Sequence, residues 1–126
     1  MAYAYDTNNI FARILRGEIP CNKVLETEHS LAFHDIGPQA PVHVLVIPKG
    51  AYVNYDHFAD AASDAEILDF TRACAAVAKQ LNLTVGAEGG GYRVISNAGG
   101  HSHQEVPHLH IHILAGRPLG PLLVKE

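Results

Sequence analysis

Apolar positions recur along the chain at two spacings, one typical of β-strands and one typical of α-helices. In a strand, successive side chains point to opposite faces, so alternating or β-branched apolar runs predict strands. Five segments have this character, and each ends at a turn residue or a loop. The predicted strands are "KVLETE" (23–28), "SLAFHDI" (30–36), "VHVLVIPKG" (42–50, stopped by Pro48 and Gly50), "YRVISN" (92–97) and "VPHLHIHIL" (106–114).

Two other segments have helical spacing. "DTNNIFARILRG" predicts a short helix that Asp6 or Thr7 would cap and Gly17 would end. A long helix is predicted to begin after Asp60 or Ser63. Because most strands follow one another through short connections, we expect an α+β domain with an antiparallel sheet. The apolar stripe of the long helix comprises Ile67, Phe70, Cys74, Val77, Ala78 and Leu81.

The composition fits one domain and argues against several classes of partner. The chain has 126 residues, 48% of them hydrophobic, which suffices for a core. A net charge of −4 argues against binding to nucleic acid or to an anionic membrane surface. No run of 18 apolar residues predicts a membrane span, and the first ten residues lack a signal-peptide pattern. Cys21 and Cys74 stand far apart, so we expect a reduced, cytoplasmic setting.

Histidine is the unusual component of the sequence, because five of the nine histidines lie within twelve residues. The last three alternate with apolar residues, so a strand would place them on one face, roughly 6.5–7 Å apart. The apolar residues between them, Leu109, Ile111 and Ile113, would then anchor the opposite face in the core. The five clustered histidines are His101, His103, His108, His110 and His112.

Three interpretations of the alternating histidines are open. A single histidine on a strand is usually structural, but three neutral rings on one face each need a hydrogen-bond partner. A zinc site is the second interpretation, although evenly spaced residues on one strand would need a ligand from elsewhere, such as His43, His101 or His103. The third is nucleophilic catalysis, in which a neutral imidazole attacks a phosphorus or acyl centre and its neighbours orient it.

Two longer segments around these histidines carry a resemblance to a known family. "HLHIHIL" resembles the signature of the histidine-triad (HIT) family. The segment "IFARILRGEIPCNKVLETEHSLAFHDIGPQAPVHVLVIPKG" resembles the N-terminal half of its nucleotide-binding Hint branch. "QEVPHLHIHILAGRPLGPLL" resembles the C-terminal part of the bacterial members, and the similarity runs over residues 9–123. The resemblance implies one HIT domain over residues 1–126 with a short tail at 116–126. It also implies a five-stranded antiparallel sheet with one long and one short helix. In a homodimer, the sheets of the two copies would join into one larger sheet.

The resemblance also implies a role for each matching residue. His110 matches the nucleophile, and His108 and His112 match its flanking histidines, which contact phosphate or assist proton movement. His43 matches a fourth histidine of the site, and Asp35 matches the carboxylate that binds the ribose hydroxyls. The apolar slot for the base matches Ile10, Phe11, Ile14, Ile19, Phe33 and Ile36, and the positions near the phosphate and leaving group match Asn97, Gln104 and Glu105.

The implied activity is hydrolysis of purine nucleoside 5′-phosphoramidates to a monophosphate and an amine, with no metal and no cofactor. Two alternatives remain: dinucleoside polyphosphate hydrolysis or nucleotidyl transfer on the same fold, and a metal-binding module that uses the histidine cluster. The loop before the triad departs from the family pattern, because Ser102 and His103 stand where glycines are common. His103 can narrow the site, add a donor or indicate a shifted loop, which leaves the rates and the preference for a leaving group open.

Overall fold

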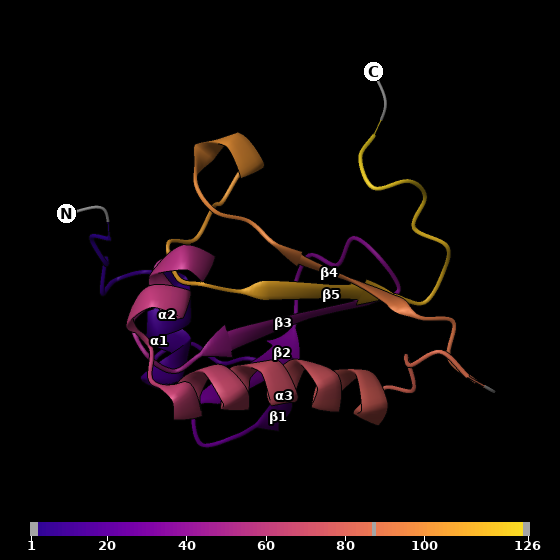
Figure 1. Cartoon of the computed structure of the whole chain (residues 1–126), viewed down its shortest axis with the longest axis horizontal. Coiled ribbons are helices and arrows are strands. Elements are labelled where there is room, and N and C mark those ends of the chain that lie inside the picture. The colour runs from indigo at the N-terminus through magenta and orange to yellow at the C-terminus, as the bar shows by residue number, and fades with distance from the viewer. Residues whose placement is uncertain (1–2, 87, 125–126) are drawn as a thin grey trace.

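A five-stranded antiparallel sheet forms the centre of the protein in the computed structural model, which describes residues 3–86 and 88–124 (Figure 1). The strand order is β1-β2-β3-β5-β4, and every neighbouring pair is antiparallel, which confirms the predicted α+β class. Most predicted segments reach one or two residues beyond the observed strand ends, where the chain turns. The strands are β1 (Lys23–Glu26), β2 (Ser30–His34), β3 (Val42–Pro48), β4 (Tyr92–Ser96) and β5 (Ile111–Ala115).

The helices include one that the sequence pattern did not predict. Ser63 caps the long helix and forms a capping box with Glu66, so the second of the two predicted caps is correct. Asp60 instead lies inside a separate seven-residue helix, α2, whose only buried residue is Phe58. One buried residue leaves no helical period to detect. The helices are α1 (Ile10–Leu15), α2 (Tyr55–Ala61) and α3 (Asp64–Gln80), with one 3₁₀ turn, η1 (Gly100–Ser102).

The start of α1 corrects a second prediction. Asn9, and not Asp6 or Thr7, is the cap, because its side-chain oxygen accepts a hydrogen bond of 2.9 Å from the backbone N–H of Ala12. Asp6 lies too far from the first helical turn, and its carboxylate accepts from the backbone N–H of Asn8 instead. No helix among the described residues is long and apolar enough to cross a membrane.

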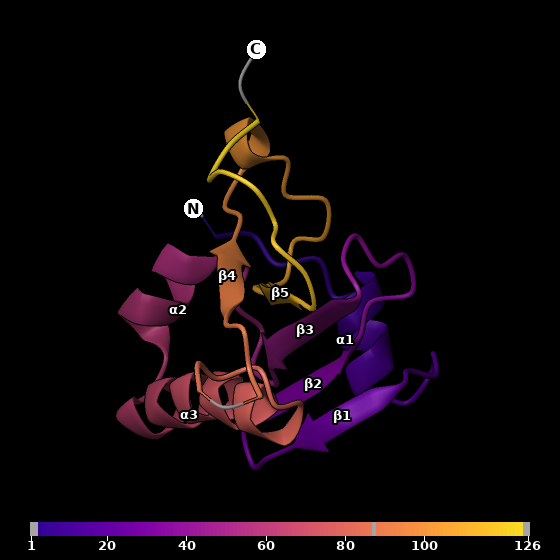
Figure 2. The same cartoon turned by 90° about the vertical axis from the view of Figure 1, so that its right-hand side faces the viewer.

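Strand β3 is buried on both faces, which explains its continuous apolar run. Figure 2 shows α3 on one side of the sheet and α1 on the other. Alternate side chains of β2 and β3 therefore belong to two different cores. The α3 side holds Ala32, Val44, Val46, Phe70, Ala73, Val77, Leu109 and Ile113, and the α1 side holds Phe11, Leu31, Phe33, Leu45 and Ile47.

The histidine segment becomes a strand only at Ile111, where its pairing with both β3 and β4 begins. Before that residue, the backbone N–H of Leu109 donates to the carbonyl oxygen of Tyr52, at 2.7 Å. The chain is thus tied to the loop after β3, and His108 and His110 lie ahead of β5. The predicted strand is too long at its start, but Leu109 is still buried in the core, as the alternation requires.

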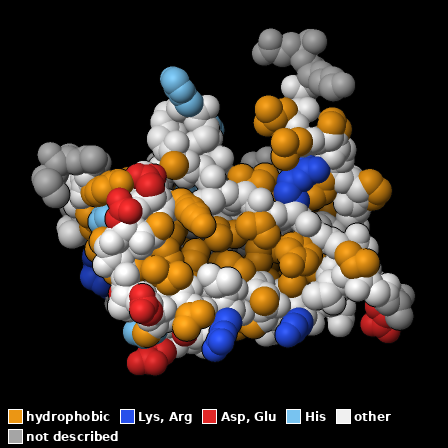
Figure 3. Space-filling model, viewed as in Figure 1, with side chains coloured by type: hydrophobic (Ala, Val, Ile, Leu, Met, Phe, Trp, Pro, Cys, Tyr) orange, Lys and Arg blue, Asp and Glu red, His pale blue; other side chains and the backbone are white. Residues whose placement is uncertain are grey.

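Strand β4 forms one free edge of the sheet, and one of its faces is open. Helix α3 packs mainly against β1, β2 and β3, so it does not cover β4. Tyr92 and Val94 are 45% and 48% exposed in consequence. Figure 3 shows hydrophobic side chains gathered above α3, over this part of the sheet. An open apolar face of this kind is typical of an interface.

Candidate active site

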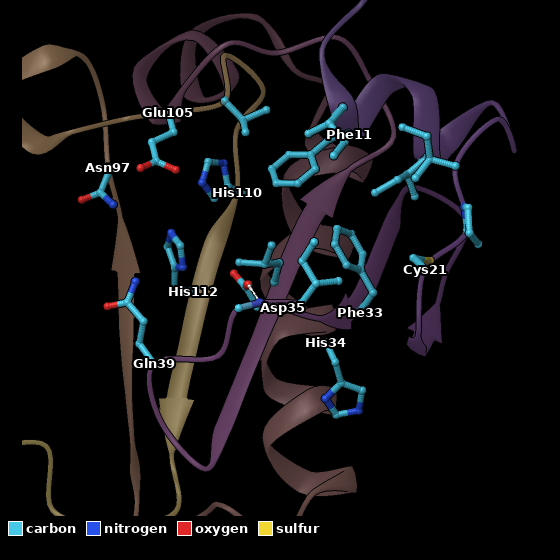
Figure 4. A pocket seen from close by; sticks show the side chains of 18 of the residues that line it. Phe11, Cys21, Phe33, His34, Asp35, Gln39, Asn97, Glu105, His110 and His112 are labelled. Atoms are coloured by element: carbon cyan, nitrogen blue, oxygen red, sulfur yellow. Dashed lines mark hydrogen bonds between the residues drawn. The ribbon is translucent and has the colours of Figure 1, made fainter.

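A cavity of about 520 Å³ opens on the α1 side of the sheet. This volume lies within the range of small-molecule sites. The walls come from α1, the end of β2, β3, the end of β4 and the segment before β5 (Figure 4). Eleven of the predicted site residues line it: Ile10, Phe11, Ile14, Ile19, Phe33, Asp35, Ile36, Asn97, Glu105, His110 and His112.

One end of the cavity is apolar and partly open. Phe11 from α1 meets Phe33 from β2 edge to face, with ring centroids 5.7 Å apart, and these two rings form the floor. Ile36 is 97% exposed and Ile10 is 41% exposed, although both are large aliphatic residues. Covering such side chains with a planar apolar group removes them from water and is favourable. This end is therefore suited to a flat, largely apolar ring.

Asp35 lies between the apolar end and the histidines (Figure 4). Its Oδ1 accepts a hydrogen bond of 2.7 Å from the backbone N–H of Gly37, which fixes the carboxylate just after β2. The other oxygen lies 3.5 Å from Nε2 of His43. A carboxylate held in this way keeps free lone pairs for hydroxyl donors in the cavity.

His110 has one ring nitrogen committed and one free. Its Nδ1 lies 2.8 Å from the backbone carbonyl oxygen of His108, and a carbonyl can only accept, so Nδ1 carries the proton. The neutral ring then has its lone pair on Nε2. Burial lowers the pKa of His110 below its ordinary value, which keeps the ring neutral at pH 7. The side chain is thus a neutral imidazole with a free nitrogen in the wall of the cavity.

His112 is part of a directed chain of hydrogen bonds. The backbone N–H of Gln39 donates to Nδ1 of His43 at 3.1 Å, so the proton of His43 is on Nε2. That Nε2 lies 2.9 Å from Nδ1 of His112, which therefore accepts and leaves the His112 proton on Nε2. Burial lowers the pKa of His112 to about 4. His112 consequently presents an N–H donor near His110, whose ring centroid is 5.0 Å away.

His108 is not equivalent to the other two histidines of the triad. Its ring is fully buried and does not line the cavity, so no surface of it is available to a phosphate there. Nε2 lies 2.8 Å from the carbonyl oxygen of Pro48, and Nδ1 lies 2.6 Å from the hydroxyl of Tyr5. His108 therefore acts on the cavity only through its backbone carbonyl, which accepts the hydrogen bond from Nδ1 of His110.

The loop before the triad forms the rim of the cavity. Glu105 and His103 both line it, and Nε2 of His103 lies 2.8 Å from a carboxylate oxygen of Glu105. His103 has a left-handed backbone, with φ of 61°, a conformation that favours glycine. The side chain of Gln104, expected near the phosphate, does not line the cavity. Its amide bonds to the backbone of Gly99, Val53 and Val106, so it holds the loop together instead.

Comparison with known proteins identifies the family. The HIT domain model matches residues 16–119. The chain belongs to the HIT family. An uncharacterized HIT-like protein of Azospirillum brasilense is 62% identical over 99% of each chain. The purine nucleoside phosphoramidase of Escherichia coli K12 is 40% identical over 93% of this chain and 94% of its own. A histidine triad protein from Clostridium difficile is similar in structure, with a TM-score of 0.78, 37% identity, and coverage of 94% of this chain and 98% of the other.

Within the HIT fold, the site contains residues that the sequence pattern did not single out for it. Gln39 lines the cavity and sets the proton position of His43 through its backbone, which side-chain patterns do not reveal. Tyr5 bonds to His108 from a segment 103 residues earlier. His34 is half-buried and lines the edge of the cavity. Cys21 also lines this edge.

One group of residues in this HIT domain has the composition of a metal site. Ligand atoms of Asp35, His43 and His112 lie within 4.8 Å of one another. A metal needs a lone pair on each nitrogen that faces it, but Nε2 of His43 carries a proton because its Nδ1 already accepts from Gln39. These hydrogen bonds therefore favour a chain of proton donors over a metal centre.

Proposed function

We propose that this HIT protein hydrolyses purine nucleoside 5′-phosphoramidates to a nucleoside monophosphate and an amine. The observation that carries the proposal is the state of His110: a neutral ring whose Nδ1–H is bound to the carbonyl of His108, with Nε2 free at the cavity. A neutral imidazole nitrogen is the form that attacks phosphorus. The name of the Escherichia coli relative, purine nucleoside phosphoramidase, agrees with this chemistry.

The order of groups along the cavity supports a nucleoside 5′-phosphate as the bound unit. The apolar end, with Phe11, Phe33 and Ile36, takes the purine base. Asp35 then accepts hydrogen bonds from the two ribose hydroxyls with its free lone pairs. The α-phosphate comes to rest against His110 and the N–H of His112.

The reaction has two displacement steps at the α-phosphorus. In the first, Nε2 of His110 attacks, the new P–N bond to the ring forms, and the P–N bond to the amine breaks. The amine takes up a proton as it leaves, and we assign to Glu105, a carboxyl group on the rim of the cavity, the transfer of this proton from water. In the second, water attacks phosphorus and gives up a proton to Glu105, the bond to His110 breaks to return the neutral ring, and the monophosphate leaves. Throughout, the His112 N–H stabilises the charge on the phosphoryl oxygens.

The central experiment is rapid-quench mass spectrometry on the protein mixed with an adenosine 5′-phosphoramidate. We expect a transient nucleotidyl adduct on His110, and we expect His110→Ala to abolish turnover while AMP binding persists. His101→Ala is the matched control, because His101 is exposed on η1 and does not line the cavity. Turnover by His110→Ala near the wild-type rate contradicts the proposal.

The same assay separates the alternative functions. Diadenosine polyphosphate is assayed in parallel with the phosphoramidate. If the protein is a dinucleoside polyphosphate hydrolase, AMP forms faster from the polyphosphate. Transfer of the nucleotidyl group to an added phosphate or alcohol indicates a nucleotidyltransferase. Loss of turnover on treatment with a chelator indicates metal chemistry at the Asp35, His43 and His112 group.

We also propose that the active form is a homodimer whose two sheets join at β4. Strand β4 is a free edge, and free edges pair readily with another strand. The exposed Tyr92 and Val94 on that edge strand supply the apolar surface that a second copy would cover.

A further inference from the structure

The N-terminal segment before α1 reaches the back of the histidine triad. The Tyr5 hydroxyl lies 2.6 Å from Nδ1 of His108, and the two rings meet edge to face with centroids 5.6 Å apart. No described side chain other than Tyr5 is hydrogen-bonded to the His108 ring, whose remaining partner is the carbonyl of Pro48. Since the ring is fully buried, both of its nitrogens depend on these two partners.

The two partners together permit one neutral form of His108. The carbonyl oxygen of Pro48 only accepts, so Nε2 must carry the proton. Nδ1 then has a lone pair, and the Tyr5 hydroxyl donates to it. Without that hydroxyl, Nδ1 is a buried acceptor with no donor, a state that costs free energy. Moving the proton to Nδ1 does not relieve this state, because the Nε2 lone pair would then face the Pro48 oxygen.

The residue held in this way is the one that orients the nucleophile. The carbonyl of His108 accepts the Nδ1–H of His110 at 2.8 Å. Phe11 packs edge-on against both rings, with centroids 6.2 Å from His108 and 5.0 Å from His110. The rings of Tyr5 and Phe11 thus pack against His108 and His110, and a displacement of His108 moves the carbonyl that fixes the ring of His110.

We infer that Tyr5 is a positioning residue for catalysis: by donating to Nδ1 of His108 it holds the His108 carbonyl where that carbonyl directs Nε2 of His110 into the cavity. The inference rests on the proposed function, because it assigns a role in the nucleophilic step of that reaction. Tyr5 does not line the cavity, so it acts on the nucleophile and not on nucleotide binding.

The chain offers a matched control for this role. Tyr3 lies two residues earlier in the same segment, and its hydroxyl donates to Asp56 while its ring stacks on His57, with centroids 4.4 Å apart. Tyr3→Phe therefore removes one hydroxyl from the same N-terminal segment without touching the triad. Any effect that comes only from loosening this segment appears in both variants.

The experiment compares Tyr5→Phe with Tyr3→Phe in single-turnover adduct formation, steady-state kinetics and AMP binding. For Tyr5→Phe we expect adduct formation and kcat to fall about tenfold, since small misplacements of a nucleophile cost at least that much. KM and the Kd for AMP stay at their wild-type values. Long-range ¹H–¹⁵N spectra of the histidine rings should show a changed Nδ1 signal for His108 and a shifted Nδ1–H signal for His110 in this variant alone.

Each outcome decides the inference. Wild-type adduct formation in Tyr5→Phe overturns it, as does an equal loss in Tyr3→Phe. If the wild-type protein forms no adduct on His110, the proposed function fails, and the ring spectra then test Tyr5 separately. Unchanged His108 and His110 signals in Tyr5→Phe overturn the positioning role, whereas the expected changes support it without reference to turnover.

Discussion

Nε2 of His43 lies 2.9 Å from Nδ1 of His112, although 69 positions separate the two residues. The register of the sheet brings them together. His112 pairs with Leu45 across β3, and His43 is two residues from Leu45 on the same strand, so the two histidines are diagonal neighbours on one face. Asp35 approaches the same point because its backbone N–H donates to the carbonyl of His43.

The first prediction concerns this pair. His43→Phe keeps a ring of similar volume but removes the donor that fixes Nδ1 of His112 as an acceptor. His112 can then adopt either proton position, and we expect kcat to fall about tenfold to a hundredfold. His43→Gln should recover part of the loss, because its amide can donate to His112. Equal kcat for the Phe and Gln variants in steady-state assays would count against the directed chain of hydrogen bonds.

The second prediction concerns stability against pH. Burial lowers the pKa of His108 from its ordinary value of 6.5 to about 4. Below pH 6.5 the unfolded chain binds a proton at this position and the native chain does not, so stability falls as the pH falls from 6.5 towards 4. The contribution of His108 is on the order of 3 kcal/mol over that range. The difference in urea unfolding between pH 7 and pH 4.5 measures this contribution together with that of His112, whose pKa burial also lowers to about 4.

The control for this pH effect is His101→Ala. His101 is exposed, so its removal should leave the difference between pH 7 and pH 4.5 unchanged. A free energy of unfolding that stays level between these two pH values would contradict the lowered pKa of the buried histidines.

The third prediction concerns the base. Ile36 is 97% exposed and lines the cavity, so Ile36→Ala should not change the thermal midpoint. It should weaken AMP binding about threefold to tenfold, because the base covers this side chain. Binding of ribose 5-phosphate, which has no base, should not change. Val85→Ala is the matched control, since Val85 is 86% exposed and does not line the cavity. Weaker binding of both ligands would argue against the assigned position of the base.

The fourth prediction concerns assembly. Val94→Lys places a charge on the open face of β4, and desolvating that charge in an interface is costly. We expect light scattering to give a dimer mass for the wild type and a monomer mass for this variant. Glu28→Lys, at the opposite edge of the sheet, should remain a dimer. A wild-type monomer at micromolar concentration would contradict the proposed assembly.

The sequence predicted those structural elements whose apolar residues repeat at a regular spacing within the segment itself. The five strand segments could be recognised because apolar residues repeat with the period of a strand, and α3 because it repeats with the period of a helix. Helix α2 could not, since it buries only Phe58 and has no period. The cap of α1 was misjudged because Asp6, Thr7 and Asn9 are all capping residues, and only the position of the first turn distinguishes them.

The alternation of histidines determined by itself that these rings share a face and that Leu109 lies in the core. The tertiary structure alone decided what each ring does. The three histidines differ because Pro48 and Tyr5 occupy the two ring nitrogens of His108. The His108 carbonyl occupies Nδ1 of His110, and His43 occupies Nδ1 of His112. Side-chain direction is a property of a single strand, whereas the proton position of an imidazole depends on whichever donor or acceptor the fold brings to it.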